Sequence, residues 1–128
     1  MSSFMQVYRA EPGEVIIQEE DIDDFMLIII EGRVNIVKDD AQGESRPMSI
    51  VGPGATLGEM SMIDGAPRFA TCIAIDTTTF CVLSRDSMVR IILEAPELGS
   101  KILIKLVTLL SQRLRTTSSD LLDRKSVV

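Results

Sequence analysis

The sequence predicts one mainly β domain, a small barrel or jelly roll, followed by two helices. The chain has 128 residues, 45% of them hydrophobic and 25% charged, as is typical of a single globular domain over residues 1–128. Glycine and proline divide its first two thirds into short β-branched and apolar segments. Its last third instead repeats apolar residues at helical spacing. A chain of this length buries enough surface to form a core without disulfides or a structural metal.

Seven short segments rich in β-branched and apolar residues are expected to be strands. They are residues 5–9, 15–18, 25–30, 34–38, 48–51, 70–75 and 79–83. Turns are expected between them because glycine permits positive φ and proline presets φ. The turn sequences are Pro12-Gly13, Glu31-Gly32, residues 39–43, Gly52-Pro53-Gly54 and Asp64-Gly65-Ala66-Pro67. Strands at such regular spacing favour a sheet that closes its own edges.

Two helices are expected after the last strand, at about residues 85–94 and 96–124. The first follows Ser84-Arg85-Asp86-Ser87, a sequence that offers side chains typical of helix N-caps. The second starts at Ala95-Pro96-Glu97, because proline is tolerated in a first helical turn and glutamate is favoured at the positive end of the helix dipole.

The second helix carries two adjacent apolar stripes. One has the alternating spacing of a coiled-coil seam and consists of Leu103, Val107, Leu110, Leu114, Thr117 and Leu121. The other lies beside it and consists of Leu98, Ile102, Leu106 and Leu109. One stripe can cover the β core while the other packs on a second copy, so we expect a homodimer through the C-terminal helix. In the alternative interpretation, both stripes form one broad face against the β core.

Composition excludes several function classes. The chain has no histidine, which removes Ser-His and Cys-His catalysis, imidazole acid–base chemistry and histidine-ligated metal sites. Its net charge is −6, from 13 basic and 19 acidic residues, whereas binding along a nucleic-acid duplex requires a basic surface. We therefore expect no catalytic residues, no metal, no cofactor, and no nucleic-acid binding by this chain alone.

Both cysteines, Cys72 and Cys81, lie in apolar segments and are expected to be buried free thiols, with pairing across a hairpin as the alternative. No secretory signal is recognised, so the reducing cytoplasm is the expected compartment. The longest apolar run, residues 25–30, is far shorter than the ~18 residues of a membrane span. We expect no membrane partner.

Residues 57–71 have the composition of an anion-binding site. Gly58 enters a helical turn whose unused backbone N–H groups can bind an anion. Arg68 directly follows Pro67, and a guanidinium directed at the same site would bind a phosphate bidentately. Glu59 would then accept hydrogen bonds from sugar hydroxyls, which predicts a ribose phosphate as ligand. In the structural alternative, Glu59 only complements a helix N-terminus and Arg68 forms a surface salt bridge.

This segment resembles the phosphate-binding cassette of the cyclic-nucleotide-binding domain family. The resemblance extends over nearly the whole chain, and the matching sequences stand in the family's order: Gly13-Glu14-Val15-Ile16, residues 24–34, Gly52-Pro53-Gly54, Gly58-Glu59-Met60 and Pro67-Arg68-Phe69-Ala70-Thr71. It implies an antiparallel β-roll, or double-stranded β-helix, with a short cassette helix and two C-terminal helices. It also implies a sensor that binds a 3′,5′-cyclic nucleotide without catalysis and repositions its C-terminal helix.

The resemblance assigns roles within the cassette. Glu59 would accept a hydrogen bond from the ribose 2′-hydroxyl, and Arg68 would bind the cyclic phosphate. The other cassette positions assigned to the ligand site are Gly58, Met60, Phe69 and Ala70, with the backbone N–H groups of Gly58, Phe69 and Ala70 completing the anion site.

Residues outside the cassette are also assigned to the ligand. Ile36 and Met48 match apolar positions on the base side, although core packing explains each nearly as well. Thr117 and Ser118 match a polar pair that, in catabolite-activator-type members, reaches the adenine amino group from both subunits. The alternative for this pair is a fraying helix end, because residues 116–119 are poor helix formers.

Three departures from the family pattern change these expectations. Phe69 stands where the family usually has a small residue, often with a hydroxyl that binds the phosphate or, as threonine, guanine. Without that hydroxyl, cyclic AMP is expected to bind in preference to cyclic GMP. Glu20 replaces a frequent glycine, and Ala55-Thr56 replace an acidic–aromatic pair, so the adjoining loops are expected to differ. The alternative function, which Phe69 favours, is a degenerate domain that serves dimerisation or docking without nucleotide.

Overall fold

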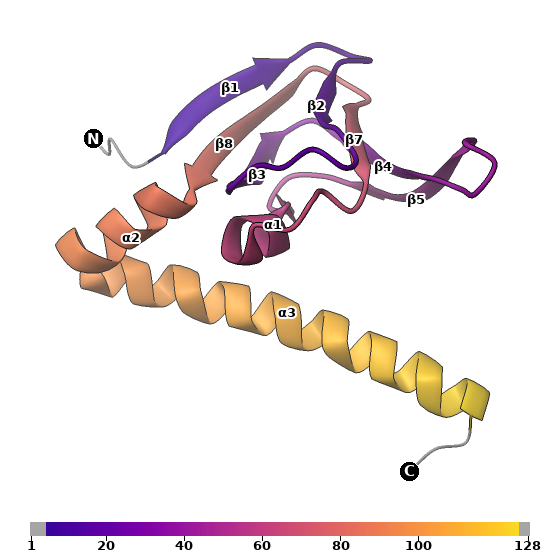
Figure 1. The fold of residues 1–128 in the computed structure, drawn as a ribbon. Coiled ribbons are helices and arrows are strands. Elements are labelled where there is room, and N and C mark those ends of the chain that lie inside the picture. The colour runs from indigo at the N-terminus through magenta and orange to yellow at the C-terminus, as the bar shows by residue number, and fades with distance from the viewer. Residues whose placement is uncertain (1–4, 126–128) are drawn as a thin grey trace. The chain divides into compact units, whose positions relative to one another are not determined.

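The computed structural model describes residues 5–125, with side chains described for residues 5–112. The chain divides into two compact units, one ending at Val89 and the other beginning at Arg90. Within the described residues, the first unit contains all the strands and the short helix α1, and the second contains the long helix α3 (Figure 1). Helix α2 begins in the first unit and ends in the second.

The strands of the first unit form two four-stranded antiparallel sheets. In order across the first sheet they are β1 (Gln6–Ala10), β8 (Thr78–Ser84), β3 (Phe25–Glu31) and β6 (Thr56–Leu57). Across the second they are β2 (Val15–Ile17), β7 (Thr71–Ala74), β4 (Val34–Asp39) and β5 (Ser45–Val51). Nearly all consecutive strands lie in opposite sheets, which is the connectivity of a β-roll. The predicted fold class is confirmed.

The hydrophobic core of this unit is supplied by both sheets. Leu27 and Ile29 of β3 belong to the buried cluster, as do Cys72 and Ala74 of β7. Members of each pair are two residues apart, and successive side chains of a strand point to opposite faces, so each pair points to the same side of its sheet. Full burial of each large aliphatic side chain stabilises the fold by roughly 1.5–3 kcal/mol.

The seven expected strands are all present, but two details of the prediction are wrong. The short strand β6 was not expected; it pairs with Leu27 and Ile28 of β3, and two residues are too few to show a period. Strand β5 begins at Ser45 rather than at residue 48 because it pairs along the whole of β4. Pro47 is a poor strand former, but β5 lies at a sheet edge, where a missing N–H is tolerated.

The turn glycines and the first cap of α2 lie where the sequence predicts them. Five expected turn glycines have positive φ between +72° and +91°, namely Gly13, Gly32, Gly43, Gly54 and Gly65. Helix α2 (Arg85–Glu94) has the predicted bounds, and the N–H of Ser87 donates to Oγ of Ser84 at 3.1 Å. Ser84 is therefore the N-cap of α2.

Helix α3 (Pro96–Lys125) begins at the predicted proline. A Cβ added at Gly99 would lie 2.9 Å from Cα of Ile92, so this glycine permits the close approach of α3 to the end of α2. The seam residues beyond 112 have no described side chains, and the choice between a dimer seam and a single broad face stays a prediction. In the described part of the chain, no helix combines the length and apolarity needed to cross a membrane.

Candidate functional site

The short helix α1 (Glu59–Asp64) opens at a glycine whose conformation and size are both required. Gly58 has φ +76° and precedes α1 directly. A Cβ at this position would overlap Nη1 of Arg68 and lie 3.1 Å from its Cζ. Glycine therefore leaves the space that the guanidinium occupies.

The side chain of Arg68 is almost completely buried, with 2% of its surface exposed. Its Nη1 donates to the carbonyl of Gly58 at 3.0 Å, its Nη2 to the carbonyl of Phe25 at 2.6 Å, and its Nε to Asp23 at 3.3 Å. Its Cζ lies 4.7 Å from the centroid of the Phe25 ring. These three bonds use three of the five N–H donors of a guanidinium, and two N–H groups of Arg68 take no part in them.

The loop between β2 and β3 holds the main chain of Arg68. The N–H of Arg68 donates to the carbonyl of Asp21 at 2.8 Å, and its carbonyl accepts from the N–H of Glu20 at 2.9 Å. Glu20 has φ +74°, a left-handed conformation that costs a non-glycine residue about 1–2 kcal/mol. The departure at this position therefore has a stability cost.

Glu59, the first residue of α1, is fully buried. The charges of both Arg68 and Glu59 affect the pKa of the Cys72 thiol. Burial raises the pKa of Cys72 to about 11, while the charge of Arg68 lowers this pKa and that of Glu59 raises it further. The two opposite charges thus lie within electrostatic reach of one buried thiol. Cys72 is a buried free thiol as expected, whereas Cys81 is free but only partly buried.

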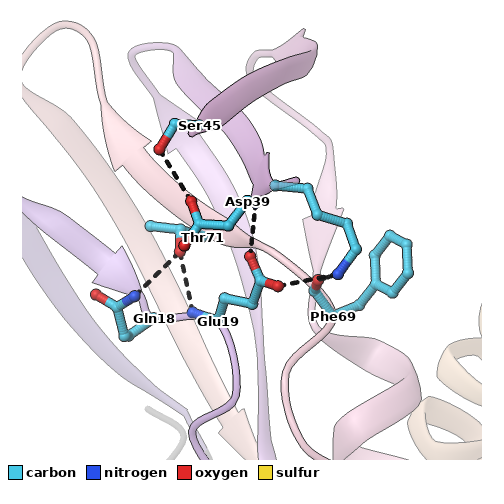
Figure 2. A network of polar contacts seen from close by, with 7 residues as sticks. Gln18, Glu19, Asp39, Ser45, Phe69 and Thr71 are labelled. Atoms are coloured by element: carbon cyan, nitrogen blue, oxygen red, sulfur yellow. Dashed lines mark hydrogen bonds and ion pairs between the residues drawn. The ribbon is translucent and has the colours of Figure 1, made fainter. Parts of the chain in front are cut away.

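A polar network lies where the cassette ends, with residues from four segments of the chain (Figure 2). Oγ1 of Thr71 accepts from Nε2 of Gln18 at 3.2 Å and from the N–H of Glu19 at 3.0 Å. The Glu19 carboxylate accepts from the N–H of Asp39 at 3.0 Å and from Nζ of Lys38 at 2.9 Å. These two bonds, the backbone one foremost, hold the pKa of Glu19 below its usual value.

The predicted site residues fall into four groups. The cassette residues Gly58, Glu59, Arg68 and Ala70 lie in or beside the buried region around Cys72, with Ala70 itself 9% exposed. The second group is exposed and consists of Met48, Met60 and Phe69. Ile36 is partly buried and packs against the core. Thr117 and Ser118 lie in the part of α3 beyond residue 112, where side chains are outside the described residues.

Sequence reasoning missed the protein partners of Arg68. Asp23 and the carbonyl of Phe25 contact its guanidinium from 45 and 43 positions away. Nothing local to either residue points to an arginine so distant, although the aspartates just before β3 were an available signal. Lys38 and Glu19 were missed as well, because their pairing depends on where β4 ends relative to the loop after β2.

One cavity of the first unit lies outside the predicted site. It has a volume of about 410 Å³ and is bounded by residues of β1, β2, β3 and β8 and by Glu14; none of the predicted site residues lines it. Among the described residues, no group of three or more Cys, Asp or Glu side chains is arranged to hold a metal ion.

Comparison with known proteins gives the family context of this geometry. The model of the family described as "Cyclic nucleotide-binding domain" matches residues 8–95. The chain is also similar to a solved cyclic nucleotide-binding domain from Methylobacillus flagellatus, at 41% identity and a TM-score of 0.83. That match covers 96% of this chain and 69% of the other.

Two curated relatives are similar over most of the chain. The Cyclic AMP receptor protein of Thermus thermophilus is 27% identical over 119 residues, which cover 93% of this chain and 53% of the relative. The CRP-like cAMP-activated global transcriptional regulator of Mycobacterium tuberculosis is 30% identical over 111 residues, which cover 87% of this chain and 48% of the relative. The chain thus spans about half the length of these relatives.

Proposed function

The chain belongs to the cyclic nucleotide-binding domain family, and we propose that it is a non-catalytic regulatory module that binds a 3′,5′-cyclic nucleotide, with cyclic AMP preferred. The observation that carries this proposal is the buried guanidinium of Arg68, which retains two N–H donors near a buried carboxylate. The names of the two curated relatives, which refer to cyclic AMP, agree with it.

Each cassette residue has a role that its position supports. Arg68 would donate its remaining N–H groups to the cyclic phosphate, and Glu59 would accept from the ribose 2′-hydroxyl. Backbone N–H groups at Gly58, Phe69 and Ala70 would complete the anion site. Charge-assisted hydrogen bonds at so buried a guanidinium are strong, because little water competes for the donors.

The preference for cyclic AMP follows from the side chain at position 69. A hydroxyl here could hydrogen-bond to guanine, and Phe69 offers none. Cyclic GMP is therefore expected to bind more weakly, and calorimetric titration with both nucleotides measures the ratio. Tighter binding of cyclic GMP would contradict the assignment.

Ligand binding is proposed to reposition the C-terminal helix, and Arg85 offers a route from the cassette to α2. Nε of Arg85 donates to the carbonyl of Met62 in α1 at 2.7 Å, and its N–H donates to the carbonyl of Asp24 at 2.8 Å. Contacts of the ligand with Thr117 or Ser118 would add a direct route. The shift is limited to the difference in ligand affinity between the two helix positions.

Arg85→Gln separates binding from coupling. This variant is expected to bind cyclic AMP with nearly unchanged affinity while losing the ligand-induced change in hydrogen exchange along α3. The exposed Arg9→Gln variant is the control, because the polar contact of Arg9 within the described residues is a long ion pair at 3.6 Å with Glu11. An unchanged exchange response in Arg85→Gln would remove this residue from the coupling route.

A homodimer through α3 remains part of the proposal. Leu103 and Val107 begin the predicted seam, and both are exposed in the single chain. Val107→Asp would place a charge in the seam and is expected to yield monomers in sedimentation equilibrium. A monomeric wild-type chain would contradict the dimer.

Thermal unfolding with and without nucleotide tests the central claim. At 100 times its Kd, a ligand stabilises the folded state by about 2.7 kcal/mol. Arg68→Lys keeps the charge but loses the forked donors, and is expected to weaken binding at least tenfold. Arg9→Gln serves again as the matched control. If millimolar cyclic AMP and cyclic GMP both leave the melting temperature unchanged, the proposal fails, and dimerisation or docking without nucleotide becomes the better explanation.

A further inference from the structure

Phe69, which follows the buried Arg68 in the sequence, is a large apolar side chain left 64% exposed. Exposure alone is common for single apolar residues and carries no conclusion. What distinguishes Phe69 is that a neighbouring strand fixes its position. Nζ of Lys38, from β4, lies 4.3 Å from the centroid of the Phe69 ring and donates to the Phe69 carbonyl at 2.9 Å.

Lys38 is itself held in place by Glu19. The Glu19 carboxylate accepts from the Lys38 ammonium through one oxygen and from the N–H of Asp39 through the other (Figure 2). The N–H of Glu19 donates to Thr71, two residues beyond the phenylalanine. Glu19 therefore ties the end of β4 to the strand that follows the cassette, and the ammonium between them is fixed over the ring.

A ring held in this way is a preorganised surface. The ammonium lies over the ring in a cation–π contact, and 64% of Phe69 stays exposed and accessible to a ligand. An aromatic face stacks on a nucleobase whatever its hydrogen-bonding edge. Because the ring is already ordered, stacking costs less conformational entropy than with a mobile side chain.

We propose that Phe69 is the base-stacking residue of the nucleotide site and that Lys38 and Glu19 are positioning residues that hold its ring. This inference rests on the proposed function, since it requires that Arg68 bind the phosphate. Its consequence is selectivity by base size: purine 3′,5′-cyclic nucleotides bind more tightly than pyrimidine ones, because the larger ring system overlaps the phenyl face more fully.

The test compares cyclic AMP with cyclic CMP, which share the ribose phosphate and differ in the base. Phe69→Ala is expected to weaken the binding of cyclic AMP about tenfold and the binding of cyclic CMP much less. Lys38→Met and Glu19→Gln are expected to lower the same purine-to-pyrimidine ratio, and Lys38→Arg to restore it, since arginine also makes cation–π contacts. The exposed Val7→Ala on β1 is the apolar control, and its ratio should equal that of the wild type.

Phe69→Trp supplies a direct optical readout, because the chain has no tryptophan. Stacking on a purine is expected to quench the indole fluorescence, and cyclic CMP to quench it less at equal occupancy. The inference would be overturned if Phe69→Ala weakened the binding of both nucleotides equally, or if the fluorescence of Phe69→Trp stayed unquenched at saturation. Either result would leave the proposed function standing. Failure of the wild-type chain to bind either nucleotide would overturn both.

Discussion

Replacing Gly58 by alanine tests whether the buried arginine lies where the structure has it. The added Cβ would overlap Nη1 of Arg68, and the residue would have to keep φ +76°. The left-handed conformation costs about 1–2 kcal/mol for alanine. Displacing the guanidinium loses its bond to the Gly58 carbonyl, which is charge-assisted and worth about 1.5–3 kcal/mol. The expected loss of unfolding free energy is therefore about 2.5–5 kcal/mol.

Gly43→Ala isolates the backbone part of this cost. Gly43 has φ +81°, but a Cβ there would meet nothing within 4 Å. Its expected cost is the strain alone, about 1–2 kcal/mol, and the reduced chain entropy of the unfolded state is common to both variants. Urea unfolding followed by circular dichroism measures the difference, provided that the slope with denaturant is unchanged.

The double variant Gly58→Ala/Arg68→Met tests whether overlap with the Arg68 guanidinium causes the loss of unfolding free energy in Gly58→Ala. If the guanidinium causes the excess cost, Gly58→Ala should cost no more than Gly43→Ala once Arg68 has been truncated. Equal costs for Gly58→Ala and Gly43→Ala in the wild-type background would refute the reasoning, because they would mean that no rigid group occupies the space beside Gly58.

Three further predictions concern stability and thiol chemistry. Folding lowers the pKa of Glu19, so its carboxylate stabilises the fold at pH values above its ordinary pKa of about 4.3, and this stabilisation is lost as pH falls through the folded-state pKa. Glu19→Gln should therefore reduce the fall in melting temperature at acid pH, and an unchanged fall would contradict this. Ser84→Ala should lower the unfolding free energy by about 1 kcal/mol through loss of the N-cap, and a cost near zero in urea titrations would count against the cap. At pH 8, three pH units below its pKa of about 11, roughly one Cys72 thiol in a thousand is ionised, so Ellman's reagent should modify Cys81 first in the folded protein; equally fast modification of both would disagree.

Much of the local structure was predictable because it depends on neighbouring residues. The turn glycines, the Ser84 cap and the start of α3 at Pro96 all follow from conformational preferences that act within a few positions. The cassette segment was recognisable for the same reason, since its glycines, carboxylate and arginine lie within one short run.

The surroundings of the candidate site depend instead on register between distant strands. Phe25 of β3 and Lys38 of β4 approach the cassette because these strands pair with other strands in particular registers, and a shift of one residue would point their side chains to the opposite face. Asp23 and Glu19 lie in the loop that joins β2 to β3, so their positions depend on where those two strands end.

The sequence by itself determined where the turns, the caps and the cassette segment lie, because those features arise from short-range conformational preferences. Only the tertiary structure decided that Arg68 is buried with donors to spare and that a lysine 31 positions away fixes the ring of Phe69. The physical reason is that burial and cross-strand contacts depend on packing between segments far apart in the chain, and no local pattern specifies that packing.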